Sequence, residues 1–280
     1  MLIVVIATCY FKDIQMFPKF TLNLILSGKL LPRVQKNKEQ QKTRTKVKAE
    51  VFTPSWVCNK MNNYCDDEWF ERNNVFNTEN ADNTWTPNKN KIEFGPQKQK
   101  RYSEWQRYVI SRRIEITCGE APYLVSRYDT TTGEYIEIDS RIGIVDRKLR
   151  VICENTKTES EWLKWAYKAF ESSYGYEWQE DNLFFARVNM VQTFIDYYEY
   201  KFATAPSKQI IKKIANIVSW NLWQMDGLKD TSPYGIPEDE FEQMSLFDKE
   251  SDKKTIYCKV KDWRNDKTIE FRSLKGGEAS

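Results

Sequence analysis

The stretch TESEWLKWAYKAFESSYGYEW (residues 158–178) indicates how the middle of the chain folds. Its apolar side chains recur at steps of three and four, at Trp162, Trp165, Ala166, Ala169 and Phe170. This spacing is typical of an amphipathic helix and predicts one from Thr158 to Tyr174. The next residues, Gly175–Trp178, predict a short strand, so a helix leads directly into a strand.

Strands and helices alternate on both sides of this stretch. Tyr108–Ile116 contains several β-branched residues and predicts a strand upstream. Downstream, LFFARVNMVQTFIDYYEYKF (183–202) predicts a long helix, with Asp181 or Asn182 as its N-cap. Ser207–Val218 predicts a further helix.

A third strand candidate, Ser219–Gln224, completes the order strand–helix–strand–helix–strand. This order predicts a parallel α/β sheet. Gly133–Cys153 has apolar residues at even steps and predicts a hairpin or two short strands. Residues 66–99 are polar and predict a loop-rich insertion, whereas Thr255–Trp263 and Thr268–Phe271 predict a strand pair.

The composition restricts the possible chemistry. Histidine is absent from the 280 residues, which excludes Ser-His-Asp or Cys-His catalysis and histidine-ligated metals. The six cysteines form no C-x-x-C pair, which argues against a zinc ribbon, and so few cysteines in a chain of this length are typical of a cytoplasmic protein with reduced thiols. The apolar opening, residues 1–9, is shorter than the roughly twenty residues that cross a bilayer. We therefore expect a cytoplasmic protein with no membrane segment.

A basic run occupies residues 29–48 and is opposed there only by Glu39. Its second half lacks apolar periodicity, which is typical of a solvated arm. Two interpretations stay open: a soluble surface segment, or an arm that contacts the phosphates of double-stranded DNA. The candidate DNA-binding residues are Lys36, Lys38, Lys42, Arg44, Lys46 and Lys48.

Two segments lie at predicted strand ends, where an open α/β sheet binds its ligands. In EITCGEAPYL (115–124), Gly119 allows the backbone to turn sharply and to approach a ligand closely. In GYEW (175–178), the acidic Glu177 ends a strand. A carboxylate at such a place can accept both hydrogen bonds of a ribose diol.

Two more segments complete a set of four: NLWQMDGL (221–228) after the third strand, and EVFTPSWV (50–57), followed by Met61, upstream. Taken in chain order (50–57, 115–124, 175–178 and 221–228), the four segments resemble the cofactor-binding half of adenine-N6 DNA methyltransferases from restriction–modification systems. That family's usual forms are F-T-P-x-x-V-x-x-M, hydrophobic-D-P-A-C-G-S-G-x-F-L, an acidic strand end, and N-I-x-x-G-D-x-L. The departures from the second form are Ile116, Glu120 and Ala121, where the family has Pro, Ser and Gly.

The resemblance implies an α/β, Rossmann-like, S-adenosylmethionine-dependent methyltransferase fold that is incomplete or decorated. It implies a methyltransferase-like domain over residues 50–274, between an N-terminal segment with its basic arm (1–49) and a short tail (275–280). In the family, the F-T-P segment packs against the methionine moiety, the acidic strand end binds the ribose, and the aspartate of the last segment binds the adenine amino group. The residues implied for S-adenosyl-L-methionine are Thr53, Pro54, Glu115, Thr117, Cys118, Gly119, Glu177, Trp178, Asp226 and Leu228.

The family's catalytic segment, N-P-P-Y or D-P-P-Y, which holds the target base, does not occur in this sequence. Ser232-Pro233-Tyr234 matches part of it, and we interpret these residues as a turn. Three interpretations stay open: a truncated product, a split subunit completed by a second methylase polypeptide, or a derived binding protein. The resemblance implies double-stranded DNA and a cognate restriction endonuclease as partners, and we assign no catalytic residue and no metal ligand.

Two alternatives come from other classes. Glu137, Asp139 and Asp146-Arg147-Lys148 on the predicted hairpin are similar to the acidic and D-x-K elements of magnesium-dependent restriction nucleases, although outward charges on an amphipathic hairpin give the same pattern. The second alternative is a non-catalytic DNA-binding or specificity subunit that keeps the fold without the cofactor.

Overall fold

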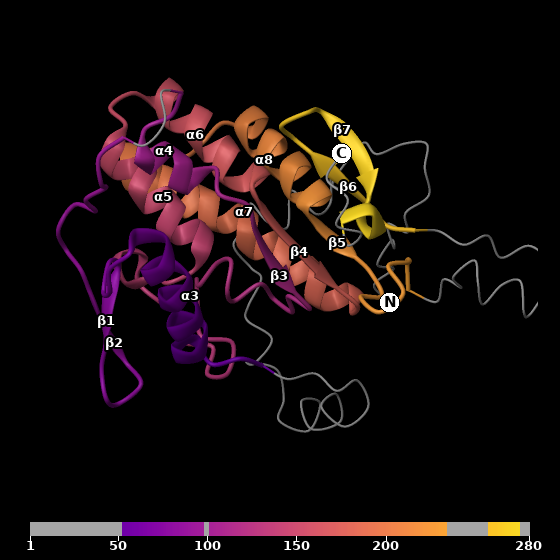
Figure 1. Cartoon of the computed structure of the whole chain (residues 1–280), viewed down its shortest axis with the longest axis horizontal. Coiled ribbons are helices and arrows are strands. Elements are labelled where there is room, and N and C mark those ends of the chain that lie inside the picture. The colour runs from indigo at the N-terminus through magenta and orange to yellow at the C-terminus, as the bar shows by residue number, and fades with distance from the viewer. Residues whose placement is uncertain (1–51, 98–100, 234–256, 275–280) are drawn as a thin grey trace, which may run out of the picture.

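The computed structural model describes residues 52–97, 101–233 and 257–274, and its architecture is mixed α/β (Figure 1). Within these residues there are six α-helices and seven short strands. The strands form one three-stranded parallel sheet and two antiparallel pairs. The predicted α/β class with a parallel sheet is therefore confirmed. No helix in the described ranges has both the length and the apolar character needed to cross a membrane.

The parallel sheet consists of β3 (Arg113–Ile116), β4 (Ser173–Glu177) and β5 (Leu222–Gln224), with β4 in the middle. Glu115 of β3 lies opposite Gly175 of β4. The second and third predicted strands are confirmed with slightly shifted bounds. Because all three strands run in the same direction, their carboxyl ends lie at one edge of the sheet.

The first predicted strand, Tyr108–Ile116, is right only in its second half. Its first residues belong to α4 (Glu104–Val109), which begins with a reciprocal capping box between Ser103 and Gln106. The capping box satisfies two backbone donors that a strand start would leave open, and this favours a helical turn despite the β-branched residues. The chain becomes extended only at Arg113.

The predicted helices on either side of β4 are confirmed. Helix α6 (Glu159–Glu171) begins after Thr158, and α8 (Lys208–Asn221) begins after Ser207. Each hydroxyl accepts a hydrogen bond from a backbone N–H of the first turn, at 3.3 and 3.4 Å. These side-chain caps explain why both helices begin where the sequence predicts.

Helix α7 (Glu180–Phe202) is the longest helix in the described residues. Its N-cap is Gln179, and the predicted caps Asp181 and Asn182 instead lie inside the first turn. The acidic residues of this turn, Glu180 and Asp181, are favourable there because they lie at the positive end of the helix dipole. The sequence therefore predicted the N-cap to within two or three residues of its position at Gln179, but it did not identify the capping residue.

The hairpin predicted over Gly133–Cys153 is wrong. This region contains a single 3₁₀ turn, η2 (Ile138–Ser140), followed by helix α5 (Ile144–Asn155). The core-facing residues of α5 recur at steps of four and three and are fully buried: Val145, Leu149 and Ile152. That helical spacing outweighs the even spacing of the isoleucines before it.

The N-terminal part of the described chain contains α3 (Ser55–Phe70) and the antiparallel pair β1 (Asn77–Glu79) and β2 (Trp85–Pro87). Apart from the end of α3 and this short pair, residues 66–97 are irregular, as predicted. Figure 1 shows α3 and the pair together at one end of the molecule. The inward face of α3 is largely polar and includes Asn59, Asn62, Asn63 and Asp66.

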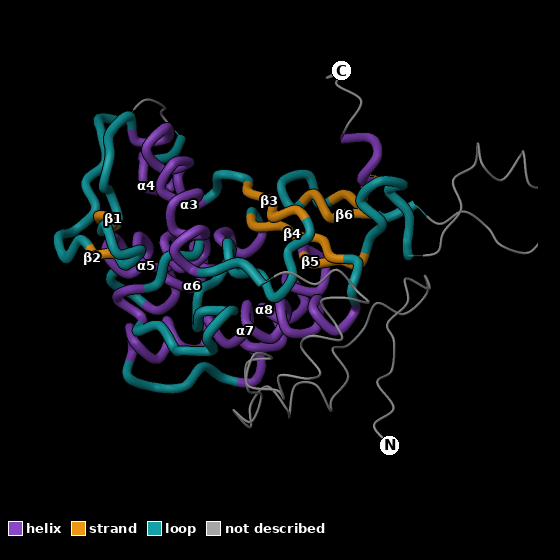
Figure 2. Tube along the Cα trace, turned by 90° about the horizontal axis from the view of Figure 1, so that it is seen from below, coloured by secondary structure: helices purple, strands orange, loops and turns teal. Residues whose placement is uncertain are grey.

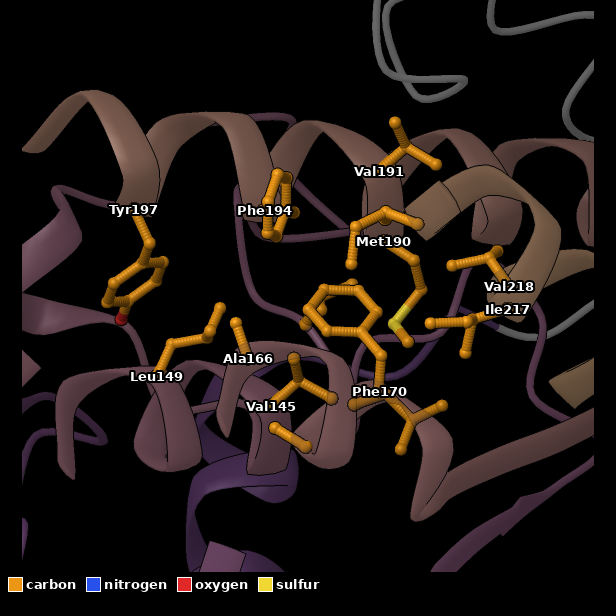
Figure 3. Close-up of a cluster of buried hydrophobic side chains, with 14 of the residues drawn as sticks. Val145, Leu149, Ala166, Phe170, Met190, Val191, Phe194, Tyr197, Ile217 and Val218 are labelled. Carbon is orange, nitrogen blue, oxygen red and sulfur yellow. The ribbon is translucent and has the colours of Figure 1, made fainter. Parts of the chain in front are cut away.

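Helices α5, α6, α7 and α8 pack together in the main hydrophobic core (Figure 3). Phe170 of α6, Phe194 of α7 and Val218 of α8 are all fully buried there. Figure 2 shows α7 and α8 on one side of the parallel sheet. Burial of aromatic and aliphatic side chains at this density is the main force that holds the helical layer against the sheet.

The strand pair β6 (Lys259–Asp262) and β7 (Lys267–Glu270) confirms the predicted pair near the end of the chain. With the 3₁₀ helix η3 (Phe271–Leu274), it packs against the opposite face of the sheet in a second, smaller cluster. The residues of this cluster are Tyr176, Trp223, Met225, Cys258, Val260 and Phe271. The pair covers β4 and β5, whereas Ile114 and Ile116 on β3 remain 46% and 63% exposed.

Candidate functional site

A tight loop follows β3 at the carboxyl edge of the parallel sheet. Its backbone has positive φ at Thr117 (49°), Gly119 (55°) and Ala121 (65°). A non-glycine residue in this left-handed region costs about 1–2 kcal/mol, so the surrounding structure must enforce the loop. A Cβ atom on Gly119 would meet no heavy atom within 4 Å, so the glycine serves the turn and has open space beside it. The predicted glycine turn is present at the predicted strand end.

Glu177, the last residue of β4, lies directly against this loop. Its Oε2 accepts a hydrogen bond from the Gly119 N–H at 2.8 Å, and its Oε1 accepts one from the Gln179 N–H at 2.9 Å. The Cys118 N–H also donates to the Tyr176 carbonyl oxygen at 2.8 Å. The structure therefore brings together the first two segments that the sequence identified, 58 residues apart in the chain.

Glu115 points away from the open edge. It is buried, and its carboxylate accepts hydrogen bonds from the backbone N–H groups of Tyr123 (3.3 Å) and Leu124 (3.0 Å). Burial raises the pKa of the Glu115 carboxyl to about 8, the two N–H groups oppose that shift, and the nearby Glu177 adds to it. Glu115 thus holds the segment after the loop in place through two backbone hydrogen bonds, and its predicted contact with a cofactor stays a prediction.

Asp226 follows β5 by two residues, on the same edge as Glu177. Its Oδ1 accepts hydrogen bonds from the backbone N–H groups of Leu228 (3.0 Å) and Lys229 (3.3 Å), which closes a turn. The Met225 N–H donates to the Glu177 carbonyl oxygen at 3.1 Å, so the two acidic segments are joined through the backbone. Leu228 is 96% exposed and packs against no apolar surface among the described residues.

The start of α3 lies close to the loop. The carbonyl oxygen of Thr53 accepts a hydrogen bond from the Thr130 hydroxyl at 2.7 Å, and the Ser55 N–H donates to Asp129 at 2.7 Å. Pro54 is the N-cap of the helix. Burial, together with Glu115 and Asp129, raises the pKa of the Cys58 thiol, which places the first turn of α3 next to the buried carboxyl. The upstream segment is therefore held against the loop at Asp129 and Thr130, on the side of the buried Glu115.

The remaining predicted residues differ in accessibility. Cys118 is buried against Gly175, where an added Cβ atom would lie 3.3 Å from the sulfur and 2.8 Å from Leu222. Thr117 is exposed, and its hydroxyl donates to the carbonyl oxygen of Ile116. Trp178 is half-buried, and its carbonyl oxygen accepts a hydrogen bond from the Gln224 amide at 2.9 Å. Of these residues, Thr117 and Trp178 have surface from which a ligand can be reached.

The basic arm cannot be placed relative to this edge. All six of its candidate DNA-binding residues precede the first described residue, Phe52, and so lie outside the described part of the chain. Glu50 and Val51 of the upstream segment, and Tyr234 of the predicted turn, lie outside it as well.

The hairpin on which the sequence interpretation placed the residues of the nuclease alternative is absent. Asp146, Arg147 and Lys148 lie on helix α5 and are buried, so they are not the outward charges of an amphipathic hairpin either. Asp146 accepts hydrogen bonds from the Ser126 backbone and hydroxyl at 2.8 and 3.2 Å. Across the described ranges, no group of three or more carboxylates or thiolates is placed to hold a metal ion.

The sequence interpretation missed a buried polar network. Arg147 donates to Asp66 at 2.7 Å, to Asn63 at 2.7 Å and to Asn59 at 2.9 Å, and its guanidinium lies over the Phe76 ring. The polar partners lie on one face of α3, and this was a readable signal. Polar residues at steps of three and four normally indicate a solvated face, but here they surround a buried cation.

A second missed residue is Lys148. Its ammonium nitrogen donates to the Ser111 carbonyl oxygen (2.7 Å) and to the hydroxyls of Ser172 (2.8 Å) and Ser173 (3.2 Å), at the amino ends of β3 and β4. Complete burial without a carboxylate bonded to it lowers the pKa of Lys148 well below its usual value. The lysine thus joins α5 to the sheet at the edge opposite the candidate site.

A hollow lies away from the sheet edge, on α6 and α8. Its volume is about 610 Å³, and its lining includes Leu163, Lys164, Tyr167 and Lys213. The Lys213 ammonium lies 3.9 Å from the centre of the Tyr167 ring. Searches against protein-family models, curated proteins and solved structures return no match for this chain.

Proposed function

We propose that this chain binds S-adenosyl-L-methionine as the cofactor half of a Rossmann-like adenine-N6 DNA methyltransferase, and that a second polypeptide completes the enzyme. The observation that supports this proposal is the 2.8 Å hydrogen bond between Gly119 and Glu177 at the carboxyl edge of a parallel sheet. Open α/β sheets bind nucleotide-like ligands at this edge. The segment of Asp226 follows the third strand at the same edge.

The groups at this edge suit an adenosine moiety. Each carboxylate oxygen of Glu177 accepts one backbone N–H and keeps a further lone pair, so a ribose diol can donate to both. Asp226 uses Oδ1 for its own turn, while its Oδ2 accepts no hydrogen bond from the described residues and is suited to an exocyclic amino group. The open space beside Gly119 allows close approach of a ligand to the backbone.

S-adenosylmethionine would supply a methyl group that is already activated on a sulfonium. The contribution of this chain is then to bind and to orient: Glu177 fixes the ribose, Asp226 fixes the adenine, and the loop at Gly119 leaves room for the sugar. In the family that the sequence resembles, the target adenine is held by the N-P-P-Y segment. Because this sequence lacks that segment, we infer that a partner provides it and that the chain alone transfers no methyl group.

An open sheet edge supports the role of a partner. Among the described residues, β3 is an edge strand, and its Ile114 and Ile116 are large apolar residues that remain exposed there. An unpaired strand with exposed apolar residues is a site to which another strand can add. The basic arm would contribute sequence-independent affinity for double-stranded DNA in the cytoplasm.

Calorimetric titration of the full chain with S-adenosylmethionine tests the proposal. We expect micromolar binding by the wild type, and at least about tenfold weaker binding by Glu177→Ala, since loss of a charged hydrogen-bond acceptor removes about 1.5–3 kcal/mol. Asp226→Ala should weaken binding in the same direction. Glu134→Ala is the matched control, because this exposed acidic residue belongs to none of the four segments.

Two outcomes would contradict the proposal. If the wild type does not bind the cofactor, the non-catalytic DNA-binding alternative is favoured instead. If Glu177→Ala and Glu134→Ala bind as tightly as the wild type, the cofactor lies elsewhere. Circular dichroism of each variant checks that folding is unchanged, because Glu177 also fastens the loop at Gly119.

A further inference from the structure

A buried carboxylate on α5 has one satisfied and one unsatisfied oxygen. Asp146 is fully buried, and its Oδ2 accepts both hydrogen bonds from Ser126. Its Oδ1 is equally inaccessible but accepts no hydrogen bond from any described residue. A buried carboxylate oxygen without a donor is strongly unfavourable, so a partner for Oδ1 has to be found.

The group facing this oxygen is unsatisfied as well. Nη2 of Arg141 pairs with Asp196 at 2.7 Å, but its buried Nη1 donates to no acceptor in the described part of the chain. Nη1 of Arg141 and Oδ1 of Asp146 are 4.0 Å apart. This distance is too long for a direct hydrogen bond, but it suits two bonds of about 2.8 Å that meet at roughly a right angle on one bridging atom.

A small cavity lies between these groups. Arg141 and Asp146 both line it, and its volume is about 10 Å³, which is roughly the space that one water molecule requires. Arg147, whose Nε is a third buried donor without an acceptor among the described residues, also lines the cavity. The cavity is therefore small, and its lining includes three buried polar atoms that have no hydrogen-bond partner among the described residues.

We propose that a single water molecule is bound between Asp146 and Arg141. Its two lone pairs accept from guanidinium N–H groups, and one of its protons is donated to the carboxylate oxygen. The lining chemistry selects water over an ion, because the carboxylate repels an anion and the arginines repel a cation. The cavity is also too small for a larger molecule.

The proposed water adds to a hydrogen-bond network that joins the start of α5 to the segment after the loop at the sheet edge. Through Ser126, whose hydroxyl oxygen accepts from the backbone N–H groups of Ile142 (2.7 Å) and Gly143 (3.1 Å), Asp146 joins the start of α5 to the segment after Gly119. A water that satisfies Oδ1 therefore stabilises the ionised Asp146 and the position of this segment. This inference does not depend on which ligand the edge binds.

A crystal structure of the full chain, at a resolution that reveals ordered water, tests the proposal directly. We expect one density peak at about 2.6–3.2 Å from both Asp146 Oδ1 and Arg141 Nη1. An empty cavity, or a direct ion pair that closes the 4.0 Å gap, overturns the proposal. A bromide soak followed by anomalous scattering distinguishes water from an anion, and an anomalous peak at this position also overturns it.

Oxygen-17 relaxation dispersion of water gives an independent test in solution. In Asp146→Asn, the amide oxygen must still accept from Ser126, so the amide NH₂ faces the arginines and the water loses its acceptor. We expect this variant to have one long-lived water fewer than the wild type. The control is Asp139→Asn, which changes an exposed residue at the rim of the same cavity and should retain the water. Equal dispersion amplitudes in Asp146→Asn and the wild type would contradict the proposal.

Discussion

Glu115 differs from the other acidic residues of the sheet edge in the direction of its carboxylate. Glu177 and Asp226 lie where the strands end, whereas Glu115 points inward to the backbone N–H groups of Tyr123 and Leu124. The burial of Glu115 has a thermodynamic consequence, because it raises the pKa of this carboxyl to about 8. A carboxyl whose pKa is raised in the folded state prefers to be protonated there, and each unit of pKa difference corresponds to about 1.4 kcal/mol.

Glu115 should therefore make the wild type less stable as the pH rises. The pKa of Glu115 is about 8 in the folded state, whereas the ordinary value for a glutamate is 4.5, so its contribution to stability is complete below 4.5 and is lost as the pH approaches 8. Glu115→Gln cannot ionise, and its single amide oxygen can accept only one of the two backbone hydrogen bonds, which go to different carboxylate oxygens in the wild type. That loss does not depend on pH. We expect the free energy of unfolding of the variant, relative to wild type, to increase steadily between about pH 5 and about pH 8.

Urea denaturation of both proteins across this pH range measures the difference. The pKa of Asp146 is also raised, to about 6, but Asp146 is present in both proteins and largely cancels in the comparison. A difference that stays constant over the whole range would show that Glu115 ionises normally in the folded protein.

At the scale of elements, the sequence predicted the features that depend on neighbouring residues, such as the capped starts of helices. The starts of α6 and α8 were predicted because Thr158 and Ser207 are side-chain caps, and β4 was predicted because a short apolar strand follows a helix. Helix α5 was missed because Asp146, Arg147 and Lys148 are residue types that normally lie at the surface. Their partners come from other elements, and no local pattern contains that information.

For the candidate site, the sequence predicted which strand ends meet, but not the direction of every side chain. Gly119 and Glu177 meet because each ends a strand of one parallel sheet, which the order of elements already implied. The inward direction of Glu115 could not be predicted, since it depends on the bend of the chain at Thr117 and on donors eight and nine residues away. The packing of α3 against α5 was also unpredicted, because it rests on one buried arginine.

That arginine provides the prediction for the interface between α3 and α5. In Arg147→Met the carboxylate of Asp66 loses its buried ionic partner, as do the amide oxygens of Asn59 and Asn63. We expect the variant to lose about 3–5 kcal/mol of stability, the usual cost of leaving one member of a buried pair without its partner. The control, Arg112→Met, removes an exposed arginine paired with Asp262 and should cost about 1 kcal/mol or less.

Urea denaturation followed by circular dichroism measures both losses. If the two variants are equally stable, the network around Arg147 contributes no more than a surface ion pair. The double variant Arg147→Met with Asp66→Leu should recover part of the stability, because it removes the isolated charge as well.

At the scale of the whole molecule, the parallel sheet has unequal surroundings. The helical layer covers one face, and the β6–β7 pair covers β4 and β5 on the other (Figures 1 and 2). In the part of the chain that the structure describes, β3 is left as an open edge beside the candidate site. The formal net charge of the chain is only +3, so the DNA affinity that we propose would have to come from regions where positive charges are concentrated. The arm over residues 29–48 is one candidate region, and the lysines on and beside α6 and α8 are another.

Two variants with the same change in net charge separate these regions. The first replaces the six arm residues by Gln: Lys36, Lys38, Lys42, Arg44, Lys46 and Lys48. The second replaces six lysines on and beside α6 and α8 by Gln: Lys157, Lys164, Lys168, Lys208, Lys212 and Lys213. Both lower the formal charge by six, so any difference between them reflects position and not overall charge.

If the arm contacts DNA, the first variant should show the weaker dependence of affinity on salt. Each phosphate contact contributes about 0.9 to the slope of log K against log salt concentration, so loss of six contacts should flatten the slope by up to about five. The second variant should retain the wild-type slope. Fluorescence anisotropy with a labelled duplex over a range of salt concentrations measures all three proteins. A flatter slope in the second variant alone would instead place the DNA on α6 and α8, beside the hollow lined by Tyr167 and Lys213.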